Sequence, residues 1–111
     1  MAVARPLQVE SVQDGDRAVL TLIGELDIAT VPRLQNAIDA ALGVKPRQLV
    51  VDLRRLGFLD SSGLRQVIVL ADRAAEEGWE LILVRPEKAV LSVFQITRAE
   101  ENLPFVDEPP A

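Results

Sequence analysis

The alternation of apolar and polar residues at the start of the chain predicts a β-hairpin. Leu7 to Gln13 alternates in this way, and Asp14-Gly15-Asp16 is a turn signal. Arg17 to Gly24 then predicts a second strand that pairs with the first. Gly24-Glu25-Leu26-Asp27 is expected to break this second strand.

A helix is predicted next, because apolar residues recur with the helical period. Thr30 is expected to be the N-cap, with Pro32 in the first turn, and Gly43 is expected to end the helix. The predicted buried face consists of Leu34, Ala37, Ile38, Ala41 and Leu42.

Two short, nearly continuous apolar runs predict strands that are buried on both faces. They lie in Gln48 to Leu53 and in Glu80 to Val84. A helix from Ser61 to Glu77, ended by Gly78, is predicted between them. This order predicts a strand-helix-strand unit with a right-handed crossover.

Shorter elements complete the predicted domain. Pro86 opens a helix over roughly Glu87 to Thr97, and Leu103 to Val106 predicts an edge strand. Residues 107–111 carry two prolines and two acids, which predicts a disordered tail. The pattern as a whole predicts one α/β domain over residues 1–106. The third helix is expected to place Val90, Val93, Phe94 and Thr97 on one side.

The long helix carries an apolar residue on its otherwise polar face. That residue is Val69, which at about 100° per residue lies opposite the predicted core stripe. Single exposed valines are common on protein surfaces, and the alternative is that Val69 is an apolar docking residue. The predicted core stripe consists of Leu64, Val67, Ile68, Ala71, Ala74 and Ala75.

The start of the same helix, Asp60-Ser61-Ser62-Gly63, has two interpretations. The plain one is a helix cap, whose loss costs about 1 kcal/mol. The other is a surface that something approaches closely, because the second hydroxyl exceeds the need of one cap. Gly63 also gives up as much as about 1 kcal/mol of helix propensity relative to alanine. The free N–H groups and positive dipole end favour an added anion such as phosphate there.

The amino-acid composition argues against most catalytic roles for Ser61 and Ser62. The 111 residues contain no cysteine and no histidine, which excludes disulfides, thiol nucleophiles and histidine-containing triads. A hydrolase acting through Ser61 would need a G-x-S-x-G elbow and a histidine. We therefore predict a protein that is not an enzyme, and no metal site is predicted.

Charge and hydropathy argue against nucleic acid and membranes as binding partners. Twelve Lys and Arg against 17 Asp and Glu give a net charge of -5, which repels nucleic acid and anionic membranes. The first six residues show no leader-like pattern, and no apolar stretch approaches the roughly 18 residues of a membrane span. We expect a cytoplasmic protein without direct contact to nucleic acid or membrane.

Four segments, in this order, resemble the bacterial anti-sigma factor antagonist family. The resemblance extends from about Leu7 to Val106 and implies the STAS fold. That fold is a small mixed sheet, here of about five strands, with helices packed on one face. The four segments are Gly24-Glu25-Leu26-Asp27 with Thr30, Leu49-Val50-Val51-Asp52-Leu53, Phe58-Leu59-Asp60-Ser61-Ser62-Gly63-Leu64, and Val93-Phe94-Gln95-Ile96-Thr97.

The resemblance implies a partner-switching regulator. In its unphosphorylated form such a protein binds an anti-sigma factor that is also a serine kinase, and so releases a sigma factor for transcription. The kinase phosphorylates the first hydroxyl residue after the aspartate of the D-S-[ST]-G motif, which here is Ser61. A serine phosphatase restores binding. ATP belongs to the kinase, so no cofactor is expected in this chain.

The resemblance and the helix analysis together suggest a partner-binding surface. Arg65 departs from the family, which usually has glycine after Ser-Gly-Leu, and this changes the docking surface beside Ser61. A STAS subunit that serves as a scaffold in a larger signalling or transporter complex is the alternative function. Besides Ser61, the candidate residues are Asp27, Asp60, Ser62, Gly63, Arg65 and Val69.

Overall fold

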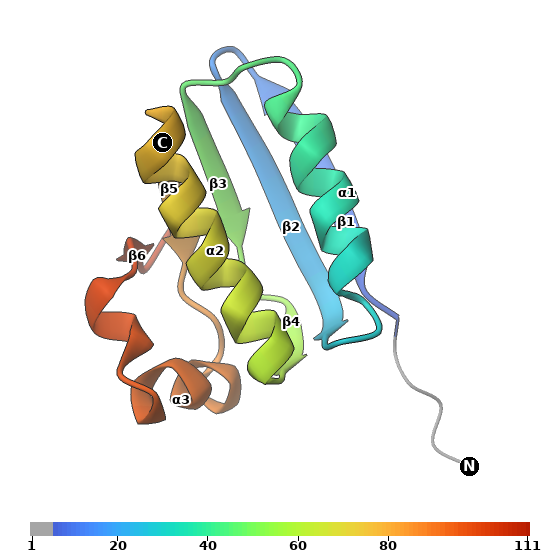
Figure 1. Ribbon diagram of the computed structural model, residues 1–111, viewed down its shortest axis with the longest axis vertical. Helices are drawn as coiled ribbons and strands as arrows, with labels where there is room; N and C mark the ends of the chain where they lie inside the picture. Colours follow the sequence, from blue (N-terminus) through green and yellow to red (C-terminus); the bar gives the residue numbers. More distant parts are fainter. Residues whose placement is uncertain (1–5) are drawn as a thin grey trace.

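A six-stranded sheet carries two long helices on one of its faces in the computed structural model, which describes residues 6–111 (Figure 1). The expectation of no leader segment was based on the first six residues, of which residues 1–5 lie outside the described part. The strands are β1 (Gln8–Asp14), β2 (Arg17–Leu26), β3 (Gln48–Asp52), β4 (Leu56–Leu59), β5 (Glu80–Val84) and β6 (Phe105–Val106). The helices are α1 (Val31–Leu42), α2 (Ser61–Glu77), α3 (Lys88–Ile96) and the short 3-10 helix η1 (Ala99–Asn102).

The sheet is mixed, as predicted. Strands β1 and β2 form the antiparallel hairpin, and the four remaining pairs, β2 with β3, β2 with β4, β3 with β5 and β5 with β6, are parallel. The predicted hairpin, the strand-helix-strand unit and the edge strand are therefore confirmed, the last as two residues only. The sheet has six strands where about five were expected, because β4 was not predicted.

Strand β2 continues to Leu26, so the strand break predicted from Gly24 onward is wrong. Its first half pairs with β3 and its last residues pair with β4, with a register shift between Gly24 and Glu25. Gly24 has a φ of 107°, and a Cβ there would lie 2.5 Å from the carbonyl oxygen of Pro6. The glycine thus marks a bulge that redirects the strand toward a new neighbour.

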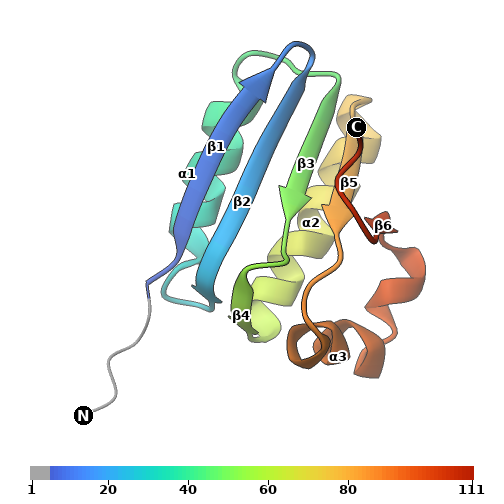
Figure 2. The same ribbon diagram turned by 180° about the vertical axis from the view of Figure 1, so that it is seen from behind.

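The hydrophobic core fills the space between the sheet and helices α1 and α2, which lie behind the sheet in Figure 2. The predicted α1 stripe is confirmed, with Leu34, Ile38 and Ala41 buried. Gly43 follows α1 as expected but has a φ of -61°, and the left-handed residue after this helix is Lys45. Helix α3 packs against the core through the buried Phe94. The Phe94 ring contacts the Phe105 ring edge-on, with 5.1 Å between the ring centroids.

Helix α2 has the predicted bounds but a slightly rotated buried face. Leu70 and Gly63 are buried, whereas Ile68 is 38% exposed and Ala75 is exposed, contrary to prediction. Viewed down the helix axis, the centre of the buried stripe lies between Val67 and Leu70. Ile68 lies about 100° from Val67 on the opposite side and therefore faces outward. On α3, Val90 is buried as expected, while Thr97 is exposed.

The last five residues run along the helix-free face of the sheet, over β5 in Figure 2. Arg85 forms an ion pair with Asp107, and Arg17 Nη1 donates hydrogen bonds to the carbonyl oxygens of Pro110 (3.3 Å) and Ala111 (3.1 Å). These contacts do not test the disorder predicted for residues 107–111, which therefore stays a prediction.

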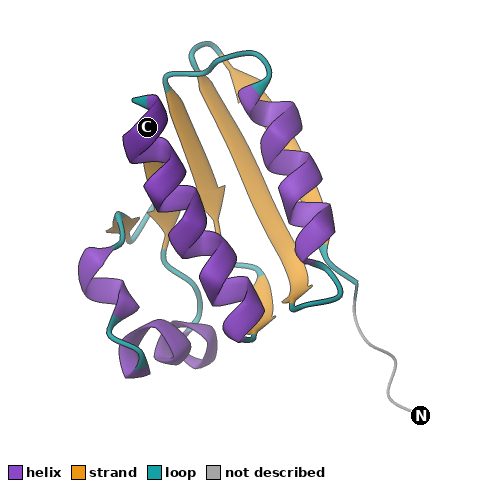
Figure 3. Cartoon of the chain, in the orientation of Figure 1, coloured by secondary structure: helices purple, strands orange, loops and turns teal. Residues whose placement is uncertain are grey.

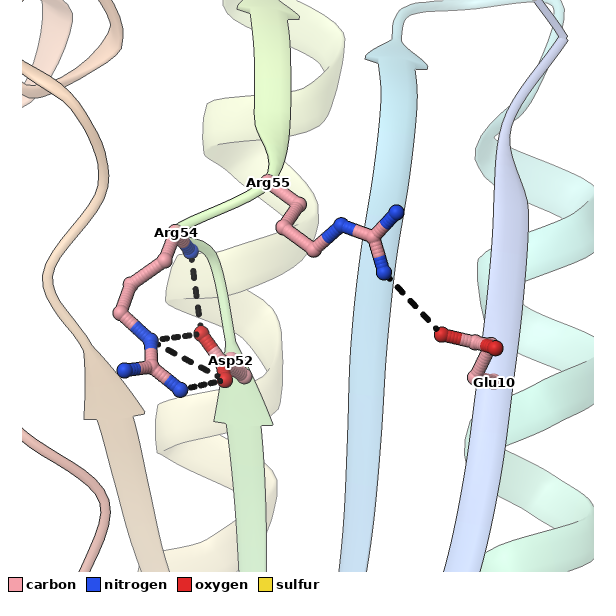
Figure 4. A network of polar contacts seen from close by, with 4 residues as sticks. All are labelled: Glu10, Asp52, Arg54 and Arg55. Carbon is pink, nitrogen blue, oxygen red and sulfur yellow. Dashed lines mark hydrogen bonds and ion pairs between the residues drawn. The ribbon is translucent and has the colours of Figure 1, made fainter.

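The helix-free face also holds a buried carboxylate at the end of β3 (Figure 4). Asp52 is only 7% exposed and accepts hydrogen bonds from the backbone N–H of Arg54 (3.0 Å) and from its guanidinium (2.8 Å at Nη2). Beside it, Arg55 pairs with Glu10 of β1 at 3.4 Å. Burial works to raise the pKa of Asp52, but the hydrogen bonds and charge of Arg54 outweigh burial, and the pKa lies below its usual value.

Acid is expected to destabilise the protein in part through Asp52. A carboxyl group with a folded pKa below its unfolded pKa gives stability that is complete above the ordinary value of about 3.9. That stability is lost as the pH falls through the folded pKa. Urea midpoints measured from pH 7 to pH 3 should therefore fall less steeply for Asp52→Asn, which is the weaker protein at pH 7. Parallel pH profiles for the two proteins would contradict this expectation.

Candidate partner-binding surface around Ser61

Ser61 is the first residue of α2 and is exposed. The start of this helix lies at the end of the molecule where β4 runs into it (Figure 3). Asp60 is the N-cap, and its Oδ1 accepts a hydrogen bond from the backbone N–H of Gly63 at 2.9 Å. This confirms the capping interpretation for Asp60 and leaves both serine hydroxyls free of that task. Asp60 Oδ2 also accepts from the N–H of Ile28 at 3.2 Å, which ties the loop after β2 to α2.

Asp27 organises that loop and the start of α1. Its Oδ1 accepts from the N–H groups of Ala29 (2.9 Å) and Thr30 (3.0 Å), and its carbonyl oxygen accepts from Val31. Thr30 stands at the N-cap position without capping, because its hydroxyl donates back to the carbonyl oxygen of Glu25 at 2.9 Å. Thr30 is therefore confirmed at the N-cap position, but its side chain does not cap the helix. The Asp27 carboxylate binds N–H groups that precede α1, and the Asp27 carbonyl oxygen binds the first N–H of the helix.

Gly63 is buried, and the close approach that it permits is that of its own chain. A Cβ at this position would lie 2.6 Å from Leu59 Cδ1 and 2.8 Å from the carbonyl oxygen of Leu26. The interpretation that Gly63 leaves room for a partner is corrected accordingly: the missing side chain lets α2 pack on β2 and β4. This packing offsets the helix propensity that is lost by having glycine in the first turn of α2.

Polar and apolar side chains of α2 line a shallow hollow beside Ser61. Val69 is 47% exposed, as its position opposite the core stripe predicted, and Ile68 joins it on the surface. Four consecutive apolar residues, 67–70, cannot all lie on one helical stripe, which is the signal that Ile68 reaches the surface. The lining residues are Ser61, Ser62, Leu64, Arg65, Ile68 and Val69.

The surface offers an exposed hydroxyl with apolar contacts around it. Ser61 makes no side-chain hydrogen bond within residues 6–111, and both oxygens of Asp60 accept backbone N–H groups. In the same described range, no three carboxylates are grouped so as to hold a metal ion. Chemically, this arrangement presents an exposed hydroxyl beside the exposed apolar side chains of Ile68 and Val69.

Residues 9–106 match the family model described as "Mlab, STAS domain". The chain belongs to the STAS domain family. This confirms the family and the fold that the sequence motifs suggested. No helix in the described part of this STAS protein is long and apolar enough to cross a membrane.

Individual relatives agree with this assignment. A STAS-domain containing protein of Pseudomonas aeruginosa is 28% identical over 88 residues, which is 79% of this chain and 86% of that protein. The anti-sigma-F factor antagonist RsfB of Mycobacterium tuberculosis is 34% identical over 59 residues, covering 53% of this chain and 48% of RsfB.

Solved structures of the anti-sigma factor antagonist SpoIIAA share the fold. The unphosphorylated form superposes with a TM-score of 0.71 at 26% identity, covering 92% of this chain and 89% of that one. SpoIIAA of Bacillus in its phosphorylated form gives a TM-score of 0.66 at 25% identity, covering 92% of both chains. The STAS chain described here therefore resembles proteins known in both modification states.

Proposed function

We propose that this protein is an anti-sigma factor antagonist that binds, through the surface around Ser61, an anti-sigma factor that is also a serine kinase. The observation that carries this proposal is an exposed, unbonded hydroxyl fixed at the start of α2 beside the exposed apolar residues Ile68 and Val69. RsfB and SpoIIAA, named as antagonists of this kind, support it. In this role the protein acts in the cytoplasm and needs no cofactor of its own.

The chain supplies only the acceptor in the phosphoryl transfer. Ser61 Oγ forms a bond to the γ-phosphorus of ATP held by the kinase, and the bond from that phosphorus to the β,γ-bridging oxygen breaks. ADP leaves, and the hydroxyl proton passes to a base of the kinase. A serine phosphatase reverses the modification by hydrolysis of the phosphoester.

The phosphate would act locally at the docking surface. It adds about 1.5 to 2 negative charges at pH 7 to a chain whose net charge is -5, next to the carboxylate of Asp60. In a close interface it brings bulk, desolvation cost and like-charge repulsion. A loss of about 3 kcal/mol weakens binding roughly a hundredfold. No refolding is needed for this effect, because the Asp60 cap and the packing of Gly63 hold the start of α2 without using the Ser61 hydroxyl.

The kinase step is tested with a trapped partner. Chain carrying Ser61→Ala serves as bait in an extract of native cells, and the captured protein is purified and mixed with ATP and fresh chain. Phosphate should appear on the wild-type chain and on the matched control Ser62→Ala, and not on Ser61→Ala. Equal labelling of all three chains, or none, would overturn the proposal.

Val69→Glu is expected to weaken binding of the captured partner by about tenfold or more, the equivalent of about 1.4 kcal/mol. A charge would replace an apolar contact at the interface. Thermal stability should hardly change, because Val69 is 47% exposed. The matched control is Val44→Glu, which is 55% exposed in the loop after α1 and should leave both properties intact. A large drop in melting temperature for Val69→Glu would place this residue in the core.

A further inference from the structure

We propose that Arg65 holds the phosphate once Ser61 carries one, so that phosphorylation also withdraws the Arg65 guanidinium from the docking surface. This inference rests on the proposed function only in taking Ser61 as the modified residue. It gives the departure from the family's usual glycine a role in the switch.

Arg65 differs from every other arginine that the structure describes. Nine arginines lie within residues 6–111, and Arg65 is the one among them whose side chain makes no hydrogen bond and no ion pair. Its side chain is exposed and lines the same hollow as Ser61. The eight paired arginines are Arg17, Arg33, Arg47, Arg54, Arg55, Arg73, Arg85 and Arg98.

The spacing on α2 brings the two side chains together. Ser61 and Arg65 are four residues apart, so they are neighbours on one helix face. Side chains on a helix tilt toward its N-terminus, which directs the long Arg65 side chain back over the turn that begins with Ser61. The Asp60 cap fixes this first turn, so the phosphate is presented at a defined position.

No carboxylate among residues 6–111 forms an ion pair with Arg65, and the carboxylates of Asp60 and Asp27 are already engaged by backbone N–H groups. Both oxygens of Asp60 accept backbone N–H groups, and Asp27 Oδ1 accepts two more. A phosphate offers three acceptor oxygens and up to two charges, and guanidinium matches this geometry with paired hydrogen bonds. Arg65 therefore has no side-chain partner among residues 6–111 in the unmodified chain, and a phosphate on Ser61 would give it one.

The test uses chain with phosphoserine installed at residue 61 during translation, and needs no kinase. The ³¹P resonance is titrated from pH 4 to pH 9. The second pKa of the phosphate, ordinarily about 6, should lie at least about 0.3 unit lower in the wild-type background than in Arg65→Gln. Asp60 and Asp27 raise this pKa equally in both backgrounds, so the difference isolates Arg65.

Matched variants separate a bound guanidinium from general charge. Arg65→Lys should restore part of the shift, because it keeps the charge and loses the paired geometry. Arg73→Gln removes the same charge from α2 two turns farther on and should leave the phosphate pKa unchanged. In ¹⁵N-labelled chain, the Arg65 Nε–H resonance should move on phosphorylation while that of Arg73 stays in place.

Coincident titrations for the wild-type and Arg65→Gln backgrounds, with an unmoved Arg65 resonance, would overturn the inference. Arg65 would then be available to a partner in both states. That outcome leaves the proposed switch untouched, since the phosphate is installed synthetically. Conversely, a failure to find any kinase for Ser61 would sink the proposed function without changing the result of the titration.

Discussion

Ser61→Asp is expected to bind the anti-sigma factor at least about 100-fold more weakly than Ser61→Ala, a difference of about 3 kcal/mol. The added carboxylate lies at the exposed start of α2 beside Asp60, where a partner would have to desolvate both charges. Ser61→Ala removes only the acceptor hydroxyl and should bind persistently. Isothermal titration with the purified partner measures the two affinities.

Ser11→Asp is the control for charge alone. It makes the same change at an exposed position of β1, away from the start of α2, and should bind like the wild-type chain. Equal affinities for Ser61→Ala and Ser61→Asp would remove Ser61 from the interface. A similar loss for Ser11→Asp would attribute the effect to net charge.

Gly63→Ala is expected to lower the free energy of unfolding by about 2 kcal/mol. The new methyl group would lie 2.8 Å from the carbonyl oxygen of Leu26, a backbone atom that cannot move without shifting β2. Better helix propensity returns at most about 1 kcal/mol. Urea unfolding monitored by circular dichroism measures the difference.

Gly57→Ala is the matched control for Gly63→Ala. A Cβ at Gly57 meets its nearest neighbour at 3.6 Å, an ordinary contact, so this variant should keep nearly full stability. If Gly63→Ala were as stable as the wild-type chain and yet failed to bind the partner, Gly63 would serve partner approach after all.

The bounds of α2 were predictable because both of its ends are encoded locally. Asp60 caps the first turn, and Gly78 ends the helix with a φ of 80°, a conformation that favours glycine. Strand β4 was not predictable in the same way. It has only four residues, includes Gly57, and exists because the bulge at Gly24 frees the end of β2 for a second partner.

The site was predictable where exposure follows from helical periodicity and not where it depends on tertiary packing. Ser61 and Val69 are exposed as their positions on α2 indicated. The inward role of Gly63 depends on how closely β2 approaches the helix, which no local pattern contains. The Thr30 hydroxyl donates to the carbonyl oxygen of Glu25 and does not cap α1, which likewise depends on the path of the loop after the bulge.

The central claim, phosphorylation of Ser61, is tested most directly by phosphopeptide mapping of the protein isolated from its native cells. Trypsin cleaves after Arg55 and Arg65 and releases residues 56–65 as one peptide, whose only hydroxyl residues are Ser61 and Ser62. Phosphate is expected on Ser61 under at least one growth condition. A well-detected peptide that stays unmodified under all conditions would contradict it and favour a STAS scaffold subunit.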